Sequence, residues 1–213
     1  MDEIQHRQLR EHFNPEGSDL RRLQKRQVEM LKYLDDICQA NDIKYWLAAG
    51  NLLGCVRHFG EFIPWDDDID IELEKKEYDR LVTVLKQQRH PDFEVQDGYN
   101  DRYFEVHFAK LRDKRSIVAE PETDLYRLRG CYIDIFPMRR GLPSVVRFTT
   151  ELRKRYFGFI ARHVSNMKMR KALTLVGKYM LQRGLFPFVN TLVRPFSRKD
   201  IVYHTPVSYT HLR

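Results

Sequence analysis

Four aspartates stand within five positions of the sequence, at Asp66, Asp67, Asp68 and Asp70. Their mutual repulsion favours a bound cation or an arginine partner, because crowded carboxylates resist ionisation without one. The alternation of aspartate and isoleucine from Asp68 to Ile71 has the period of a strand, which predicts Asp66, Asp68 and Asp70 on one face and Asp67 on the other. Mg²⁺ prefers oxygen ligands and keeps coordination positions for phosphate oxygens. The segment therefore predicts a site in which Mg²⁺ or Mn²⁺ holds a phosphate-containing substrate.

A third carboxylate, Asp134, lies in the string CYIDIFP, where Ile133 and Ile135 on either side predict a second strand. If that strand neighbours the first, three carboxylates could hold two ions about 3.5 to 4 Å apart and clamp both oxygens of a phosphoryl transfer. Most acidic runs are instead solvated or helix-capping loops. Here apolar residues 62–65 lead into the run and isoleucines interleave with the acids, which favours a packed element.

Gly50 and Asn51 stand where a short buried strand, residues 43–50, meets a helical turn. A glycine at such a junction lets backbone N–H groups approach a phosphate closely. Glycine is more often a plain turn residue at this kind of junction. The pair is therefore a candidate phosphate contact only in combination with the aspartates.

Two pairs of cationic residues complete the candidate site. Arg57 and His58 follow Gly50 by about two helical turns, and Lys110 and Arg112 lie two apart on a predicted strand, so that they share a face. Such side chains suit a clamp on substrate phosphates, but an ion network with the aspartates is an equally good interpretation. His58 is a candidate for proton transfer, although an unpaired histidine is more often structural.

The elements that must position these residues follow from hydrophobic periodicity and turn signals. A helix is predicted over residues 18–40, capped by Ser18 and stopped by Asn41, and a second one over residues 75–88. Strands are predicted over residues 43–50, 68–71, 93–96, 103–112 and 130–136, and two or three basic amphipathic helices between residues 143 and 196. This order predicts an α+β fold.

The charge is divided unevenly along the 213 residues, although the chain is short enough to suggest a single catalytic domain. Residues 1–138 carry 21 Lys or Arg against 28 Asp or Glu, whereas residues 139–213 carry 16 against 2. The basic half mixes cations with aromatic and aliphatic residues, which favours an anionic membrane surface. A solvated helical surface ranks second and nucleic acid third among its interpretations.

Location and processing signals are few. The odd count of three cysteines fits neither a disulfide framework nor a zinc site, and neither a secretory signal nor an apolar run long enough to span a membrane is present. These observations predict a cytoplasmic protein, peripheral on the inner face of the cytoplasmic membrane. Residues 206–213 match no preceding pattern and are interpreted as a non-native tail.

Together, the strings LAAGNLLGCVRHFGEFIPWDDDIDIEL, AKLRD and YIDIFP closely resemble the LicD family of phosphotransferases, which is related to fukutin-type proteins. The resemblance covers residues 23–138. It implies a nucleotidyltransferase-like fold, a mixed β-sheet flanked by helices, with residues 1–138 as the catalytic core. Residues 139–205 are predicted, from their basic composition, to be a helical extension of the same domain. It also implies transfer of phosphocholine or a polyol phosphate from a CDP-linked donor to a hydroxyl of a cell-surface glycan or glycolipid, as in lipopolysaccharide or teichoic acid modification.

The resemblance also implies roles for particular residues. Asp68 and Asp70, with Asp66 close by, would hold metal and donor diphosphate, and Asp134 would be a metal ligand or the base for the acceptor hydroxyl. Gly50 resembles the glycine of the family's glycine-hydroxyl turn, while Asn51 stands where the family usually has a hydroxyl residue. Arg57 and His58 fall in its R-H-x-G stretch, near the site.

Two alternatives remain at this point. A D-x-D motif also holds nucleotide-sugar diphosphates, so a glycosyltransferase is the alternative enzyme. A catalytically inactive, membrane-associated relative is the alternative from another class. The G-N turn and the later D-I-F-P string favour the phosphotransferase.

Overall fold

The computed structural model describes residues 2–101, 103, 104, 106, 108–119, 124–193, 195 and 202–204. The interpretation of residues 206–213 as a non-native tail therefore lies outside the described residues. The chain divides into two compact units, Met1–Pro137 and Met138–Arg213.

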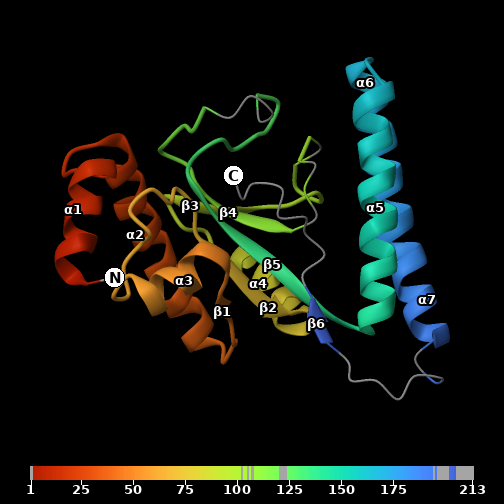
Figure 1. Cartoon of the computed structure of the whole chain (residues 1–213), viewed down its shortest axis with the longest axis horizontal. Coiled ribbons are helices and arrows are strands. Elements are labelled where there is room, and N and C mark those ends of the chain that lie inside the picture. The colour runs from red at the N-terminus through yellow and green to blue at the C-terminus, as the bar shows by residue number, and fades with distance from the viewer. Residues whose placement is uncertain are drawn as a thin grey trace. The chain divides into compact units, whose positions relative to one another are not determined.

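A mixed five-stranded sheet forms the centre of the first unit (Figure 1). Its strands lie in the spatial order β1 (Trp46–Leu47), β2 (Asp70–Glu74), β5 (Tyr132–Gly141), β4 (Ala109–Asp113) and β3 (Phe93–Gln96). The pairs β1–β2, β5–β4 and β4–β3 are antiparallel. Helices flank this sheet, so the predicted α+β class is confirmed.

Four helices accompany the sheet: α1 (Glu3–Phe13), α2 (Asp19–Ala40), α3 (Ala49–Arg57) and α4 (Lys75–Gln87). The prediction for α2 is confirmed, since the Ser18 side chain accepts a hydrogen bond from the Arg21 backbone N–H at 3.1 Å and Asn41 ends the helix. The prediction for α4 is confirmed to within one residue. The helix α1 was not predicted, although Asp2 and Gln5 form a capping box at its start.

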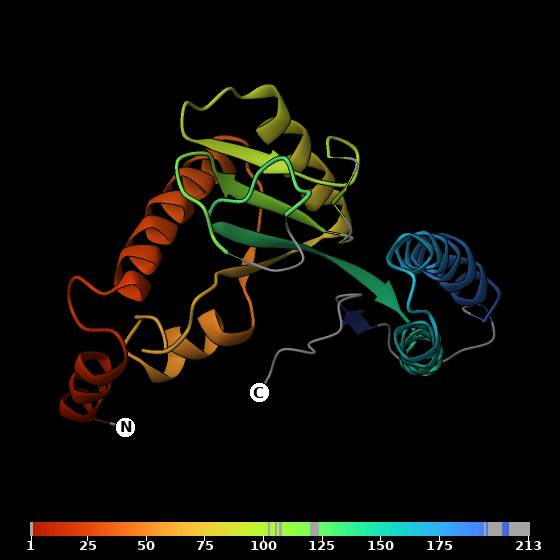
Figure 2. The ribbon, with the colours of Figure 1, turned by 90° about the horizontal axis from the view of Figure 1, so that it is seen from above.

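The hydrophobic core lies between the sheet and the two helices α2 and α4 (Figure 2). Alternate residues of the strands point into it, as the period of two requires. These core side chains include Ile71, Leu73, Val95, Leu111, Ile133 and Ile135 from the strands and Met30, Leu34, Leu81 and Leu85 from the helices. The residues between them on β2, β4 and β5 therefore face the other side of the sheet, and four of these are both charged and buried: Asp70, Lys110, Arg112 and Asp134.

Four strands differ from their predicted bounds. The strand predicted over residues 43–50 is reduced to β1, because α3 begins at Ala49 and takes Gly50 into its first turn. The described strand within residues 103–112 begins only at Ala109, and β5 continues past residue 136 to Gly141. The strand β2 begins at Asp70, so the alternation from Asp68 did not mark its start.

The second unit is a helical hairpin (Figure 1, Figure 2). The helix α5 (Pro143–His163) packs against a continuous run of α6 (Met167–Tyr179), the π-helical segment η1 (Met180–Leu185) and α7 (Phe186–Val193). Leu142, Val145 and Phe186 form its small apolar cluster, and the short strand β6 (Val202–His204) pairs with Arg139–Gly141. Among the described residues, no helix is both long and apolar enough to cross a membrane.

Candidate functional site

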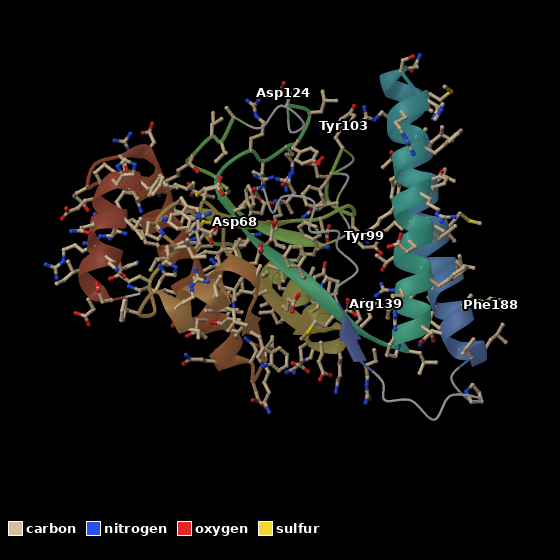
Figure 3. The ribbon with its side chains drawn as sticks, viewed as in Figure 1. Asp68, Tyr99, Tyr103, Asp124, Arg139 and Phe188 are labelled. Atoms are coloured by element: carbon tan, nitrogen blue, oxygen red, sulfur yellow. The ribbon has the colours of Figure 1, made fainter. Side chains whose placement is uncertain are left out.

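The first three aspartates lie on an irregular segment just before β2, and Asp68 is labelled in Figure 3. Carboxylate oxygens of Asp66, Asp67 and Asp68 all lie within 4.8 Å of one another. The prediction that Asp67 faces away from the other two is therefore wrong, because strand alternation does not extend over residues 66–68. Burial, and then the charges of Asp68 and Asp67, raise the pKa of Asp66 to about 7.

Asp70 and Asp134 bring the neighbouring strands β2 and β5 into the same site. The Asp134 backbone N–H donates to the Ile69 carbonyl oxygen at 2.8 Å, and both carboxylates are buried. Burial, and then the charges of Asp68 and Asp134, raise the pKa of Asp70 to about 8. The pKa of Asp134 is also raised, chiefly by burial and in part by Asp68. The structure therefore places Asp68, Asp70 and Asp134 close enough to repel one another.

Lys110 and Arg112 share a face of β4, as their spacing predicted, and both are held by neighbouring groups. The Lys110 ammonium lies 2.8 Å from Asp134 Oδ1 and 3.3 Å from the centre of the Tyr132 ring. The fully buried Arg112 donates to Gln96 Oε1 at 3.0 Å and to the Gly130 carbonyl oxygen at 2.8 Å. Lys110 thus lies at the carboxylate site, whereas the described bonds of Arg112 link β4 to β3 and to Gly130.

Gly50 and Asn51 contact the aspartate segment directly. A methyl group on Gly50 would lie 2.3 Å from Asp66 Oδ2, so only glycine leaves room for this carboxylate. The Asn51 side chain donates to the Asp68 carbonyl oxygen at 2.9 Å and accepts from the Asp70 backbone N–H at 2.5 Å. The predicted phosphate contact at this turn stays a prediction, and the observed partners are aspartates.

Arg57 and His58 end the helix α3 in different environments. Arg57 is exposed, and within the described residues no hydrogen bond or ion pair holds its guanidinium. His58 is buried beside His6 and Trp65, with ring centres 5.1 and 6.3 Å away. Burial, and then the charges of His6 and Arg57, lower the pKa of His58, which favours the neutral ring. Arg57 is accordingly the cation of this pair that can contact an anionic ligand.

Two residues of the site were missed by the sequence analysis. Gln24 and Gln27 lie on α2 and are almost fully buried, and their side-chain amides donate to the carbonyl oxygens of Asp66 and Asp67 at 2.8 and 2.9 Å. The only signal was two glutamines on the apolar face of a predicted helix, where a polar residue needs a partner.

These carboxylates have the chemistry that a divalent cation requires. Within the described residues, Asp66 Oδ2 is buried without a hydrogen-bond donor, although buried polar atoms are normally paired. The raised pKa values of Asp66 and Asp70 reflect burial and repulsion that a cation would offset. The carboxylates of Asp66, Asp67 and Asp68, whose oxygens lie within 4.8 Å of one another, therefore fit Mg²⁺ or Mn²⁺ with oxygen ligands only, and the charges of Asp70 and Asp134 act on the same site.

Comparison with known proteins identifies residues 42–176 as matching the family described as LicD/FKTN/FKRP, nucleotidyltransferase domain. This range contains every residue of the candidate site except Gln24 and Gln27. No solved structure matches the chain significantly.

Curated relatives include the lipopolysaccharide cholinephosphotransferase LicD of Haemophilus influenzae, which is 31% identical over 130 residues, 61% of this chain and 47% of that protein. The ribitol 5-phosphate transferase FKRP of Homo sapiens and that of Mus musculus are each 44% identical over 43 residues, 20% of this chain and 8% of theirs. The chain thus spans half or less of the length of these relatives. The family match itself covers more than half of the chain and includes the aspartate segment and Asp134. The chain therefore belongs to the LicD/FKTN/FKRP family and matches its nucleotidyltransferase domain over residues 42–176.

Proposed function

We propose that this chain transfers a phospho-alcohol, phosphocholine or a polyol phosphate, from a CDP-linked donor to a hydroxyl of a cell-surface glycan or glycolipid. The proposal rests on one observation above all: in this member of the LicD/FKTN/FKRP family, Asp68, Asp70 and Asp134 lie on neighbouring segments, close enough for their charges to interact. The names of the relatives, a cholinephosphotransferase and a ribitol 5-phosphate transferase, support the class of transferred group.

In this proposal, some residues of the site bind the donor and one accepts a proton. Asp66, Asp68 and Asp70 hold Mg²⁺ or Mn²⁺ with the donor diphosphate, and the exposed Arg57 contacts its phosphates. When bound, the cation neutralises the diphosphate and the charge that develops on the leaving phosphate. The hydroxyl oxygen of the acceptor forms a bond to the transferred phosphorus, the bond to the leaving CMP breaks, and Asp134 accepts the hydroxyl proton. Its raised pKa suits a base, since burial strengthens its affinity for the proton.

The basic second unit supports a location at the inner face of the cytoplasmic membrane, where glycolipid acceptors would be within reach. Its exposed surface carries both cations, such as Arg155 and Arg162, and large apolar side chains, such as Phe148, Phe159 and Phe188, the last labelled in Figure 3. This combination suits peripheral binding to anionic lipids.

The test is to incubate the protein with CDP-choline, CDP-ribitol, CDP-glycerol or a UDP-sugar, with and without Mg²⁺ or Mn²⁺, and a glycan acceptor. Cation-dependent release of CMP is expected. Release of UDP instead would favour a glycosyltransferase, and no release from any donor would favour an inactive relative. Asp68→Asn and Asp70→Asn should abolish turnover with the fold retained, whereas Asp36→Asn, at an exposed position of α2, should leave it unchanged.

A further inference from the structure

Three consecutive carbonyl oxygens of the aspartate segment accept hydrogen bonds from side-chain amides rather than from a strand or helix. The bonds run from Gln24 Nε2 to Asp66, from Gln27 Nε2 to Asp67 and from Asn51 Nδ2 to Asp68, at 2.8, 2.9 and 2.9 Å. Two of these amides come from α2 and one from α3, so the segment is held from two helices.

The chemistry of these three donors matters as much as their number. A lysine or arginine could hold a carbonyl oxygen equally well, but its charge would neutralise the neighbouring carboxylates and compete with a cation. An amide donates a hydrogen bond and carries no charge. The segment is thus held in an irregular conformation by groups whose charge does not offset that of its carboxylates.

Each amide is tied to a second group, which limits its movement. The Gln24 side-chain oxygen accepts from Asn14, and Gln27 also donates to the Tyr132 carbonyl oxygen at 3.2 Å, two residues before Asp134. Asn51 accepts from the Asp70 backbone N–H, which links the segment to the first residue of β2. Gln27 and Asn51 therefore fix Asp67 and Asp68 relative to the strands that carry Asp134 and Asp70.

We infer that Gln24, Gln27 and Asn51 form an amide clamp, a set of positioning residues that holds the aspartate segment ready for a divalent cation and the donor diphosphate. This inference rests on the proposed function for the identity of the ligand. The clamp itself acts before any ligand binds. Partners that orient metal ligands typically change metal affinity or activity by about 10- to 100-fold when they are replaced.

The test compares the unchanged protein with Gln27→Met, Asn51→Leu and the control Gln39→Met. Methionine keeps the length of the glutamine side chain and removes its donors, and leucine keeps the branched shape of asparagine and removes both of its hydrogen bonds. Gln39 lies exposed on the same helix, and its side-chain amide donates to Asp35 Oδ2 at 2.6 Å rather than to the aspartate segment. Tb³⁺ binding is followed by luminescence sensitised by tryptophan, since Trp65 precedes Asp66, and Mn²⁺ binding by competition.

Gln27→Met and Asn51→Leu are expected to weaken Tb³⁺ and Mn²⁺ binding by about 10- to 100-fold at a melting temperature close to that of the unchanged protein. Hydrogen exchange of the peptide covering residues 66–70 should also become faster without any cation. Gln39→Met should change neither quantity. Two variants are used so that a folding failure of one leaves the other as the test.

The outcomes separate this inference from the proposed function. No binding of Tb³⁺ or Mn²⁺ by the unchanged protein would overturn the proposed function, and the inference with it. If the unchanged protein binds these ions and Gln27→Met and Asn51→Leu bind them equally tightly, with unchanged hydrogen exchange, the clamp alone would be overturned.

Discussion

Asp66 and Asp70 are carboxyl groups that the fold keeps partly protonated. Burial contributes most to this, and the neighbouring aspartates add to it, so that the pKa values rise from 3.8 to about 7 and about 8. A pKa that is higher in the folded than in the unfolded protein makes the folded state bind more protons between the two values. The free energy of unfolding contributed by these groups is therefore greatest below pH 4 and is lost as the pH rises through 7 and 8.

This difference predicts a pH dependence of stability for the cation-free protein. With EDTA present, the melting temperature should fall between pH 6.5 and pH 8.5, and Mg²⁺ or Mn²⁺ should remove most of the fall by binding the ionised carboxylates. Asp70→Asn should flatten the same curve, since an amide does not titrate. The lowered pKa of His58 has the opposite effect, since it makes the free energy of unfolding increase with pH, and this effect is complete below the pH range of the test. A melting temperature that is constant, or rises, in EDTA would contradict the prediction.

Gly50 allows a residue-scale test of how Asp66 is placed. The methyl group of Gly50→Ala would lie 2.3 Å from Asp66 Oδ2, a distance that forces the carboxylate to move. Because a short side chain can move without unfolding the chain, the melting temperature should change little. Cation affinity, measured by Tb³⁺ luminescence, should fall about 10-fold or more. Ala49→Gly, at the neighbouring position, serves as the control and should bind Tb³⁺ normally.

At the scale of elements, the helix α3 is fixed by its close approach to the segment that leads to the aspartates. A methyl group on Gly54 would lie 2.5 Å from the Glu61 carbonyl oxygen, and this backbone atom cannot rotate away. Gly54→Ala should therefore destabilise the protein by about 1 to 3 kcal/mol, as overpacking does. Chemical denaturation measures the loss, and Cys55→Ala, at an exposed position of α3, should have almost no effect. An unchanged midpoint for Gly54→Ala would show that α3 can move away from residues 61–63.

The elements that the sequence could predict are those with long, regular periodicity. The helices α2 and α4 repeat their apolar residues over several turns, and the alternation around Asp134 correctly indicated β5. The conformation of residues 66–68 could not be predicted, because side chains of α2 and α3 determine it from at least 15 positions away. The aspartates could be named as candidates from their spacing alone. Gln24 and Gln27 could not, because their contacts with the aspartate segment join parts of the chain that are far apart in the sequence.

At the scale of the whole molecule, the division of charge has a physical consequence. Residues 1–138 are acidic and residues 139–213 carry 16 Lys or Arg against 2 Asp or Glu, so the two parts respond to polyanions in opposite ways. An anionic surface repels the first part and attracts the second. Binding to such a surface, if it occurs through the second unit, therefore depends on individual cations of α5 and α6.

Vesicles test this consequence. The protein should float with vesicles that contain phosphatidylglycerol and not with vesicles of phosphatidylcholine alone, and 0.5 M salt should reduce the binding because it screens the charges. A cation near an anionic membrane contributes about 1 kcal/mol, so Arg155→Glu with Arg162→Glu should weaken binding by well over 10-fold. Phe159→Ser should weaken it further, because this exposed ring lies on the same helix and would enter the lipid interface.

The matched control for this prediction changes two exposed cations of the first unit, in Lys32→Glu with Lys44→Glu, and so alters the net charge by the same amount. If binding follows net charge alone, both double variants should lose it equally. If it depends on the second unit, the control should bind nearly as well as the unchanged protein. Equal flotation of all variants with both kinds of vesicle would mean that the basic residues of α5 do not contact lipid, and the second unit would then be a solvated helical surface.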